Sequence, residues 1–212
     1  MTDSATTHDV GPHDAEGWKL HDDGTRVHRY NCTIHDGQGC DGHCGPAPAC
    51  LVDETAAPQP DVTIVSIGRL HDADGGEWAD VLRRATIALD LRAHFRDPHA
   101  ISADLRQLTA HDQVVRDTVM ETPGVREVLA ATALQVQGYL AGPTAAPLTV
   151  VTHCAGGRHR AATTAMALRA VIAGDVEQAA AYGLADAAKQ FVDRDLVVDL
   201  VHRDLDKDVV DR

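Results

Sequence analysis

The segment that most constrains the fold is LTVVTHCAGGRHRAATTAMALRAVI, residues 148–172. Its first part, LTVVTH, is apolar and β-branched, which is typical of a buried strand. A glycine pair and three basic residues follow, and residues 158–173 are rich in helix-forming alanine. A strand that leads through a short loop into a helix is the repeating unit of α/β domains. The segment therefore predicts a central strand, a loop and a helix.

The rest of the chain after residue 60 continues this alternation of strands and helices. Strands alternating with helices indicate an α/β fold, with a small, largely parallel sheet flanked by helices. Ligands of such sheets bind beyond the carboxyl ends of the strands. By apolar pattern we expect strands at 62–68, 85–92, 148–153 and 196–202, and helices at 103–122, 124–142, 158–173 and 175–192.

Composition divides the chain into four parts. Residues 1–16 are polar and rich in turn-forming residues, so we expect a disordered start. Residues 17–52 begin with two alternating runs around Asp23-Gly24, which predict a hairpin, and then become rich in cysteine and histidine. Residues 53–60, DETAAPQP, read as a linker, and residues 61–212 as the α/β domain.

The loop after the central strand has the composition of an anion-binding site. Gly156 and Gly157 allow unusual φ values and a close approach of backbone to ligand. Amide groups and the positive end of the helix would face the anion, and the basic side chains would add full charges. A glycine turn with exposed basic residues is the alternative, but it does not explain three consecutive cationic side chains beside a strand end. The predicted phosphate-binding loop comprises Cys154, Ala155, Gly156, Gly157, Arg158, His159 and Arg160.

The same loop satisfies a catalytic signature. HCAGGRHR matches the His-Cys-x-x-Gly-x-x-Arg pattern of protein tyrosine phosphatases, with Cys154 as nucleophile and Arg160 on the phosphate. Two departures count against activity. Ala161 stands where those enzymes usually carry a hydroxyl, and no Asp lies between Thr118 and His153 to serve as the acid. A cysteine-dependent phosphatase is therefore the alternative to a non-enzymatic binding role.

Residues 61–207 as a whole resemble the C-terminal domain of the RNase adapter family RapZ. Five motifs occur in the order of that family, and an ordered set is far more specific than any one motif. The resembling segments are VSIGRLH, LDLRAHFRDPH, LRQLTAHD, CAGGRHR and VHRDLDK.

The resemblance implies a regulatory or adapter domain that binds a ligand. The family is associated with sensing an amino-sugar phosphate, glucosamine-6-phosphate, and with binding small regulatory RNAs and an endoribonuclease. When the family's site residues are matched to this sequence by position, the resemblance adds further residues to the ligand site. Asp90 and Arg92 would also suit a structural ion pair, and the His-Arg-Asp run would also suit a run of surface ion pairs. The family's Gly-x-x-x-x-Gly-Lys-Ser/Thr loop is missing, so nucleotide hydrolysis is not expected. The added residues are Asp90, Arg92, His202, Arg203 and Asp204.

Net charge limits the partners. At −13 the chain lacks the basic excess that nucleic-acid binders use on phosphates, so RNA binding is doubtful. No run of about 18 apolar residues and no secretory signal occurs, so we expect a cytoplasmic protein outside the membrane. The expected partner is a phosphorylated small molecule, with a protein partner and an oligomer left open.

A separate cluster of cysteines lies near the N-terminus. Thiolates and imidazoles are the ligands that Zn²⁺ prefers. A short segment with few apolar side chains to bury needs a bound metal or a similar cross-link to fold. The spacing matches no specific zinc signature, so free thiols and disulfides remain alternatives to a structural zinc. The candidate metal ligands are Cys32, Cys40, Cys44 and Cys50.

Overall fold

The computed structural model describes residues 18–20, 26–28, 59–71, 76–98, 102–144 and 146–210. Its elements fall into two units, with strands β1 and β2 in one and every element from β3 onward in the other. β1 (Trp18–Leu20) pairs antiparallel with β2 (Arg26–His28), as the alternating runs around Asp23-Gly24 predict. The boundaries proposed at residues 16, 52 and 60 stay predictions.

The second unit is built on a four-stranded sheet in which every strand is parallel to its neighbours. The order is β4-β5-β3-β6, with β3 at Val62–Gly68, β4 at Ile87–Asp90, β5 at Leu148–Cys154 and β6 at Val198–His202. The strand register brings their carboxyl ends together, because Gly68 lies opposite Cys154 and Asp90 opposite His153. The predicted α/β fold with a parallel sheet is confirmed.

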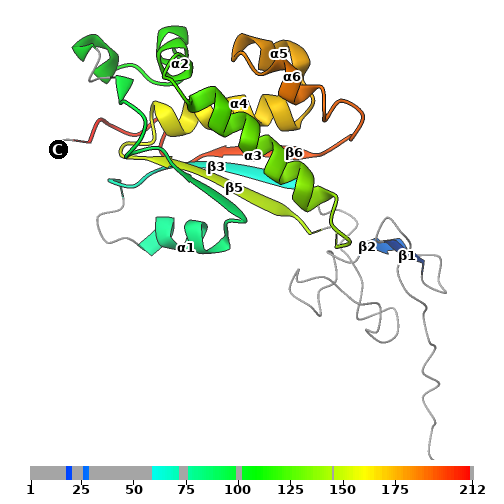
Figure 1. The fold of residues 1–212 in the computed structure, drawn as a ribbon. Coiled ribbons are helices and arrows are strands. Elements are labelled where there is room, and N and C mark those ends of the chain that lie inside the picture. The colour runs from blue at the N-terminus through cyan, green and yellow to red at the C-terminus, as the bar shows by residue number, and fades with distance from the viewer. Residues whose placement is uncertain are drawn as a thin grey trace, which may run out of the picture. The chain divides into compact units, whose positions relative to one another are not determined.

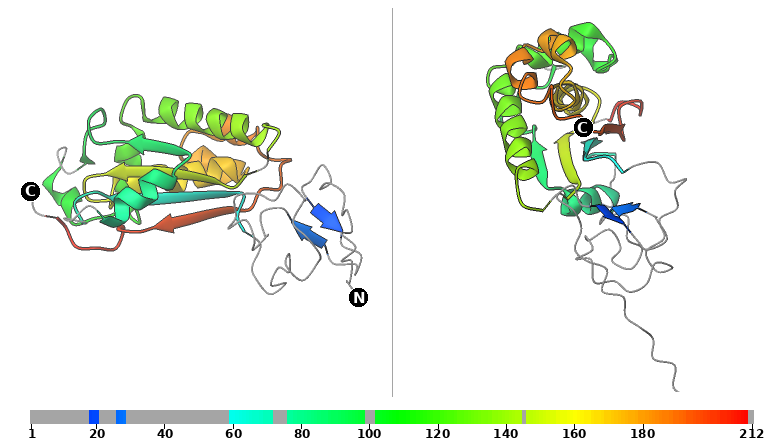
Figure 2. Two further views of the ribbon diagram at one scale, coloured as in Figure 1. Left: turned by 90° about the horizontal axis from the view of Figure 1, so that it is seen from below. Right: turned by 90° about the vertical axis from the view of Figure 1, so that its right-hand side faces the viewer.

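Helices cover both faces of this sheet. α1 (Gly76–Arg84) lies on one face, and α3 (Val125–Leu140), α4 (Arg160–Ile172), α5 (Val176–Ala181) and α6 (Ala185–Ala188) lie on the other (Figure 1). α2 (Gln113–Met120) packs against α4 on that second face. The view from below in Figure 2 looks onto the sheet, whose strands lie side by side in the order β4-β5-β3-β6.

The strand order explains why the faces are occupied in this way. The connection from β3 through α1 passes β5 to reach β4, whereas the connection from β5 through α4 passes β3 in the opposite direction to reach β6. Because crossovers between parallel strands are right-handed, connections that run in opposite directions place their helices on opposite faces. The chain therefore diverges at the ends of β3 and β5, which is where ligands of open α/β sheets bind.

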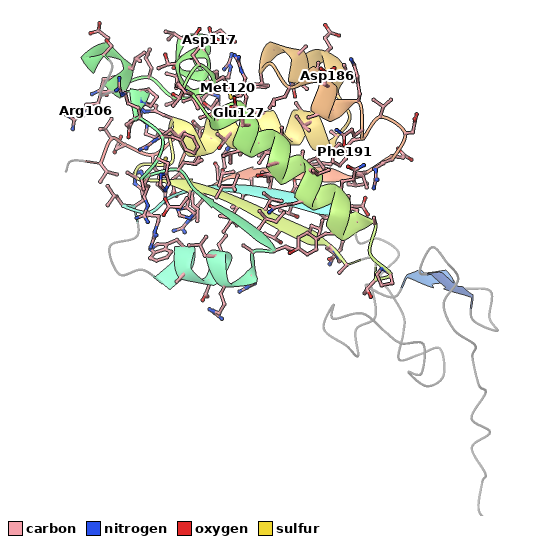
Figure 3. All side chains as sticks on the ribbon, in the orientation of Figure 1. Arg106, Asp117, Met120, Glu127, Asp186 and Phe191 are labelled. Atoms are coloured by element: carbon pink, nitrogen blue, oxygen red, sulfur yellow. The ribbon has the colours of Figure 1, made fainter. Side chains whose placement is uncertain are left out.

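The core lies between the sheet and α4. Alanines along α4 let this helix approach the sheet closely, and Ala165, Leu168 and Ile172 are fully buried. Met120 of α2 and Phe191 also belong to this core, whereas Asp117, Glu127 and Asp186 lie on the exposed sides of their helices (Figure 3). The loop between β5 and α4 is thus carried by the most buried strand and helix of the domain.

Several predicted elements differ in extent. The helix expected at 103–122 is instead a 3-10 turn, Ala103–Arg106, and then α2. Between them the Asp112 carboxylate accepts the Thr109 amide at 2.9 Å, which stabilises a turn before α2. The helix expected at 175–192 is divided into α5 and α6 at Gly183, whose φ is +73°. Helix α1 was not predicted. No helix in the described segments is long and apolar enough to cross a membrane.

Candidate functional site

The loop from Cys154 to Arg160 is packed against the end of β3. A Cβ atom on Gly68 would lie 2.4 Å from the Gly156 carbonyl carbon, and one on Gly157 would lie 2.8 Å from the Gly68 nitrogen. Gly157 also has a φ of +75°, in the left-handed region that favours glycine. The close approach that glycine permits is therefore backbone to backbone, and it fixes the loop beside β3.

Gly156 has a different environment. No heavy atom lies within 4 Å of the position that its Cβ would occupy, so the space beside it is open. Gly156 borders a small cavity of about 60 Å³. Its other lining residues are Leu70, Asp97, Cys154, Arg158, His159 and Val210.

The loop amides are oriented by hydrogen bonds on its other side. The Arg69 and Leu70 amides donate to the carbonyl oxygens of Cys154 and Ala155, at 3.0 and 2.9 Å. Since N–H and C=O of a trans peptide point in opposite directions, the Gly156 N–H points away from residues 69–70. Within the described residues, the amides of Gly156, Arg158 and His159 have no hydrogen-bond partner. Unpaired donors at the positive end of a helix form an anion site.

Arg160 was predicted to bind a phosphate, but its side chain already forms hydrogen bonds with other residues of the protein. It is 5% exposed, and one terminal nitrogen donates to the carbonyl oxygens of Leu91 and Phe95 at 2.9 and 2.7 Å. The other donates to the Asp97 carboxylate at 2.6 Å. Its Nε is buried and has no partner. The guanidinium therefore holds the segment after β4 against the start of α4.

The two other basic side chains of the loop also meet protein acceptors. His159 Nε2 lies 2.8 Å from the Leu108 carbonyl oxygen, and its Nδ1 lies 3.4 Å from Asp97. Arg158 donates to the Gln107 carbonyl oxygen at 3.0 Å, and its Nε is buried without a partner. The basic run thus fastens two neighbouring segments, near residues 91–97 and 107–108, and only part of its donor capacity remains for a ligand.

Cys154 does not have the environment of a nucleophile. The residue is 3% exposed and packs against Leu91 and Ala161. Its Sγ accepts the Gly157 amide at 3.2 Å. Burial raises the pKa of the thiol, although the Ala161 amide and the Arg160 charge act in the opposite direction. A buried thiol is inert, whereas reactive cysteines are accessible thiolates.

Asp90 and Arg92 form an ion pair whose side chains are about two-fifths exposed, and a contact of either residue with a ligand stays a prediction. Arg92 Nε and a terminal nitrogen donate to the two Asp90 oxygens at 2.9 and 2.6 Å. These hydrogen bonds hold the pKa of Asp90 well below its usual range and raise that of Arg92. His153, buried beside them, has its pKa lowered by burial and an Nδ1 without a hydrogen bond.

The His-Arg-Asp run after β6 is more buried than a surface ion-pair run would be. Asp204 is 0% exposed and accepts the Gly68 amide at 2.7 Å, while Lys207 lies 2.6 Å from its other oxygen. His202 Nδ1 lies 2.7 Å from the Ser66 hydroxyl. The Arg203 amide donates to the Ser66 carbonyl oxygen. These residues hold the end of β3, so they support the loop through Gly68.

A larger pocket of about 700 Å³ adjoins the loop. Arg92 and Arg160 border it, and Leu70 and Asp97 belong to both this pocket and the small cavity. Asp97, Leu70 and Phe95 were not among the predicted site residues. The sequence could have indicated Asp97 as a site residue, because it lies in the LDLRAHFRDPH motif after a strand. Leu70 and Phe95 are ordinary apolar residues, and nothing in the sequence distinguishes them.

No cluster of three or more His, Cys, Asp or Glu that could hold a metal occurs in the described part of the chain. The candidate zinc ligands Cys32, Cys40, Cys44 and Cys50 lie outside the described residues. The zinc site stays a prediction.

Comparison with known families gives one result. The sequence model described as RapZ C-terminal domain matches residues 62–183, more than half of the 212 residues. The match includes β3, the segment after β4, the loop and α4, and it ends before β6. No curated protein matches the chain.

Proposed function

This chain belongs to the RapZ C-terminal domain family, and we propose that it is a regulatory or adapter domain that binds a phosphorylated small molecule at the Cys154–Arg160 loop. Family membership supports the regulatory role. The observation that carries the phosphate site is the set of unpaired amides of Gly156, Arg158 and His159 at the positive end of α4.

In this proposal the phosphate occupies the cavity beside Gly156. The volume of about 60 Å³ suits one small anion, and backbone donors together with the helix end supply its binding energy. Arg158 has a buried, unpaired Nε at this cavity, which adds a charged donor. Arg160 acts indirectly, by fixing the segment that closes the cavity on the Asp97 side.

The rest of the ligand would occupy the 700 Å³ pocket. Asp97 borders both spaces, and a carboxylate beside a phosphate site disfavours a ligand that carries only negative charge. A ligand with an ammonium or hydroxyl group near its phosphate would instead bind Asp97 favourably. An amino-sugar phosphate such as glucosamine-6-phosphate carries an ammonium group as well as a phosphate, whereas a nucleotide has no ammonium group.

Isothermal titration calorimetry with glucosamine-6-phosphate, glucose-6-phosphate and a nucleotide tests the proposal. We expect the amino sugar to bind most tightly, and glucose-6-phosphate to bind more weakly because it lacks the ammonium group. Gly156→Val should abolish binding by filling the cavity, since the open space beside Gly156 accepts a side chain without a clash in the fold.

A matched control is Gly138→Val, because Gly138 in α3 also has open space at its Cβ position but lies away from the loop. This variant should bind like the wild type. If no sugar phosphate or nucleotide binds the wild-type chain, or if Gly156→Val binds as tightly as Gly138→Val, the proposed site is wrong.

A further inference from the structure

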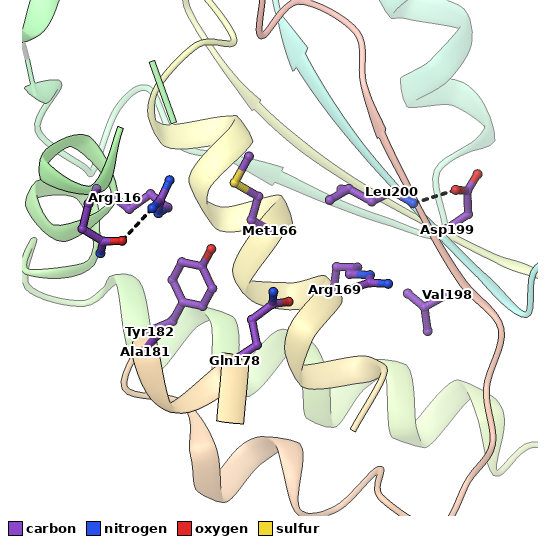
Figure 4. Close-up of a pocket in the computed structure, with 10 residues that line it drawn as sticks. Arg116, Met166, Arg169, Gln178, Ala181, Tyr182, Val198, Asp199 and Leu200 are labelled. Atoms are coloured by element: carbon purple, nitrogen blue, oxygen red, sulfur yellow. Dashed lines mark hydrogen bonds between the residues drawn. The ribbon is translucent and has the colours of Figure 1, made fainter. Parts of the chain in front are cut away.

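A second pocket, which we call the α4–β6 groove, lies outside the candidate site. Its volume is about 640 Å³, within the range of roughly 300–1,000 Å³ that small-molecule sites occupy. Residues of α2, α4, α5 and β6 surround it (Figure 4). The lining residues are Gln113 and Arg116 of α2, Met166 and Arg169 of α4, Gln178, Ala181 and Tyr182 at α5, and Val198, Asp199 and Leu200 of β6.

Two guanidinium groups of this groove have no carboxylate partner among the described residues, although the whole chain carries a net charge of −13. Arg116 is held by its donations to the carbonyl oxygens of Ala110 and His111, both at 2.7 Å, and to the Gln113 side chain at 2.6 Å. These acceptors are neutral, so they position the charge without cancelling it.

Arg169 is less constrained. It is half-buried, and its side chain has no hydrogen bond to any described residue. A cation in the last turn of a helix is stabilised slightly by the helix end, but the Arg169 side chain extends from α4 toward Val198 of β6 (Figure 4). A partly desolvated guanidinium directed across a pocket has donors available for an anion.

The Asp199 carboxylate also belongs to the lining and accepts the Leu200 amide at 2.9 Å, and apart from the two arginines the remaining groups are neutral. The Tyr182 hydroxyl and the Gln178 amide are directed into the groove, on the α5 side (Figure 4). Burial raises the pKa of Tyr182, while the nearby Arg116 charge acts in the opposite direction, so the phenol is a neutral hydrogen-bond donor. Met166 and Leu200 supply apolar surface on the opposite side. Apolar walls with a few polar groups are the usual composition of a metabolite site.

The free edge of β6 beside the groove does not suit an added strand. The Leu200 amide donates to the Asp199 carboxylate at 2.9 Å, so this edge donor is already used. β-strand addition depends on unpaired main-chain groups along the edge. The groove therefore fits a small ligand better than an extended peptide.

From this arrangement we propose that the α4–β6 groove is a second ligand site, which takes a small organic dianion with an apolar body. Its anionic group meets Arg169 and Arg116, and its body contacts Met166 and Leu200. Arg169 follows Arg160 by nine positions on α4, which is about 14 Å along the axis. One helix therefore connects the two sites, and the site goes beyond the function proposed for the loop.

The test uses phenyl phosphate, a dianion with an apolar ring, in calorimetry on the whole chain. The titration is made in the Gly156→Val background, in which the loop cavity is filled. We expect binding to persist there, and Arg169→Gln to weaken it by at least about tenfold, because the arginine makes charged hydrogen bonds to the anion. Tyr182→Phe should weaken it by a smaller factor.

The matched control is Arg83→Gln, an exposed arginine on α1 at the other face of the sheet. This variant should bind phenyl phosphate as tightly as the Gly156→Val background does. The melting temperature of every variant should stay within a few degrees of that of the background. Absence of binding in the Gly156→Val background, or equal affinity of Arg169→Gln and Arg83→Gln, would overturn the groove site. Glucosamine-6-phosphate binding by Arg169→Gln in the otherwise wild-type chain tests the loop separately.

Discussion

The Asp97 carboxylate lies 2.6 Å from a terminal nitrogen of Arg160, and both side chains are nearly buried, at 15% and 5% exposure. The pair joins the segment after β4 to the first residue of α4. It also means that the arginine of the phosphatase-like signature has its counter-charge inside the protein. At the proposed site we therefore expect anion binding to depend on backbone amides and Arg158 more than on Arg160.

Replacing Asp97 with Asn should affect stability and phosphate binding in opposite directions. The Arg160 charge would lose its buried partner, and we expect a loss of about 3 kcal/mol in the free energy of unfolding. The same change removes a negative charge from the cavity, so inorganic phosphate should bind several-fold more tightly. Urea denaturation and phosphate titration measure the two effects.

Asp80→Asn is the control for stability, because Asp80 pairs with Arg83 on the exposed side of α1. Such surface pairs contribute at most about 1 kcal/mol. If Asp97→Asn and Asp80→Asn had the same free energy of unfolding, the buried Asp97–Arg160 pair would not be what fixes the loop.

Gly68 is predicted to tolerate no side chain. Alanine at this position would place its Cβ 2.4 Å from the Gly156 backbone, which cannot move without displacing the loop. We expect Gly68→Ala to lose at least about 3 kcal/mol of stability and all loop binding. Gly138→Ala, on the exposed side of α3, should instead gain up to about 1 kcal/mol. Equal stability of the two variants would contradict the packing of β3 against the loop.

Cys154 should be nearly inert toward alkylation in the folded protein. Burial raises the pKa of its thiol and blocks access to reagents. Iodoacetamide at about pH 8, followed by peptide mass mapping, should modify Cys154 only after unfolding. Cys154→Ser should leave any hydrolysis of an aryl phosphate unchanged. Fast labelling of Cys154, or hydrolysis that this substitution abolishes, would restore the phosphatase alternative.

Stability should fall as the solution becomes acidic through the histidine range. Burial lowers the pKa of His153 and His202 in the folded protein, so the unfolded chain binds protons more tightly. The contribution of these histidines to the free energy of unfolding is fully present above their unfolded pKa of about 6.5, and it is lost as the pH falls below that value. Between about pH 7 and pH 5 we expect a loss on the order of 1 kcal/mol. The double variant His153→Gln/His202→Gln should show a smaller pH dependence, and an unchanged dependence would refute this origin.

The sequence predicted the sheet well, because its strands carry their own signal. The β-branched runs of β3 and β5 consist of buried and half-buried residues, and the strands end at Gly68 and Cys154, close to where the pattern places their ends. α1 was missed because it is a nine-residue helix that begins at a glycine and has half-exposed residues on its inner side. Trp78, Val81 and Leu82 do have helical spacing, but so short a run without a capping residue gives too weak a signal to distinguish a helix from a loop.

The loop was predictable in position but not in its contacts. The sequence placed Gly156, Gly157 and three basic residues at a strand end. It could not show that Arg158, His159 and Arg160 are bound by the carbonyl oxygens of Gln107, Leu108, Leu91 and Phe95. Backbone acceptors have no residue type, so only the folded chain reveals which basic side chains are engaged.

The most direct test of the central claim is a crystal structure of the chain grown with glucosamine-6-phosphate. We expect phosphate density in the cavity beside Gly156, with oxygens about 2.7–3.2 Å from the amides of Gly156, Arg158 and His159. The amino group should face Asp97. Phosphate density at another place, or an empty cavity at saturating ligand, would show that the loop is not the phosphate site.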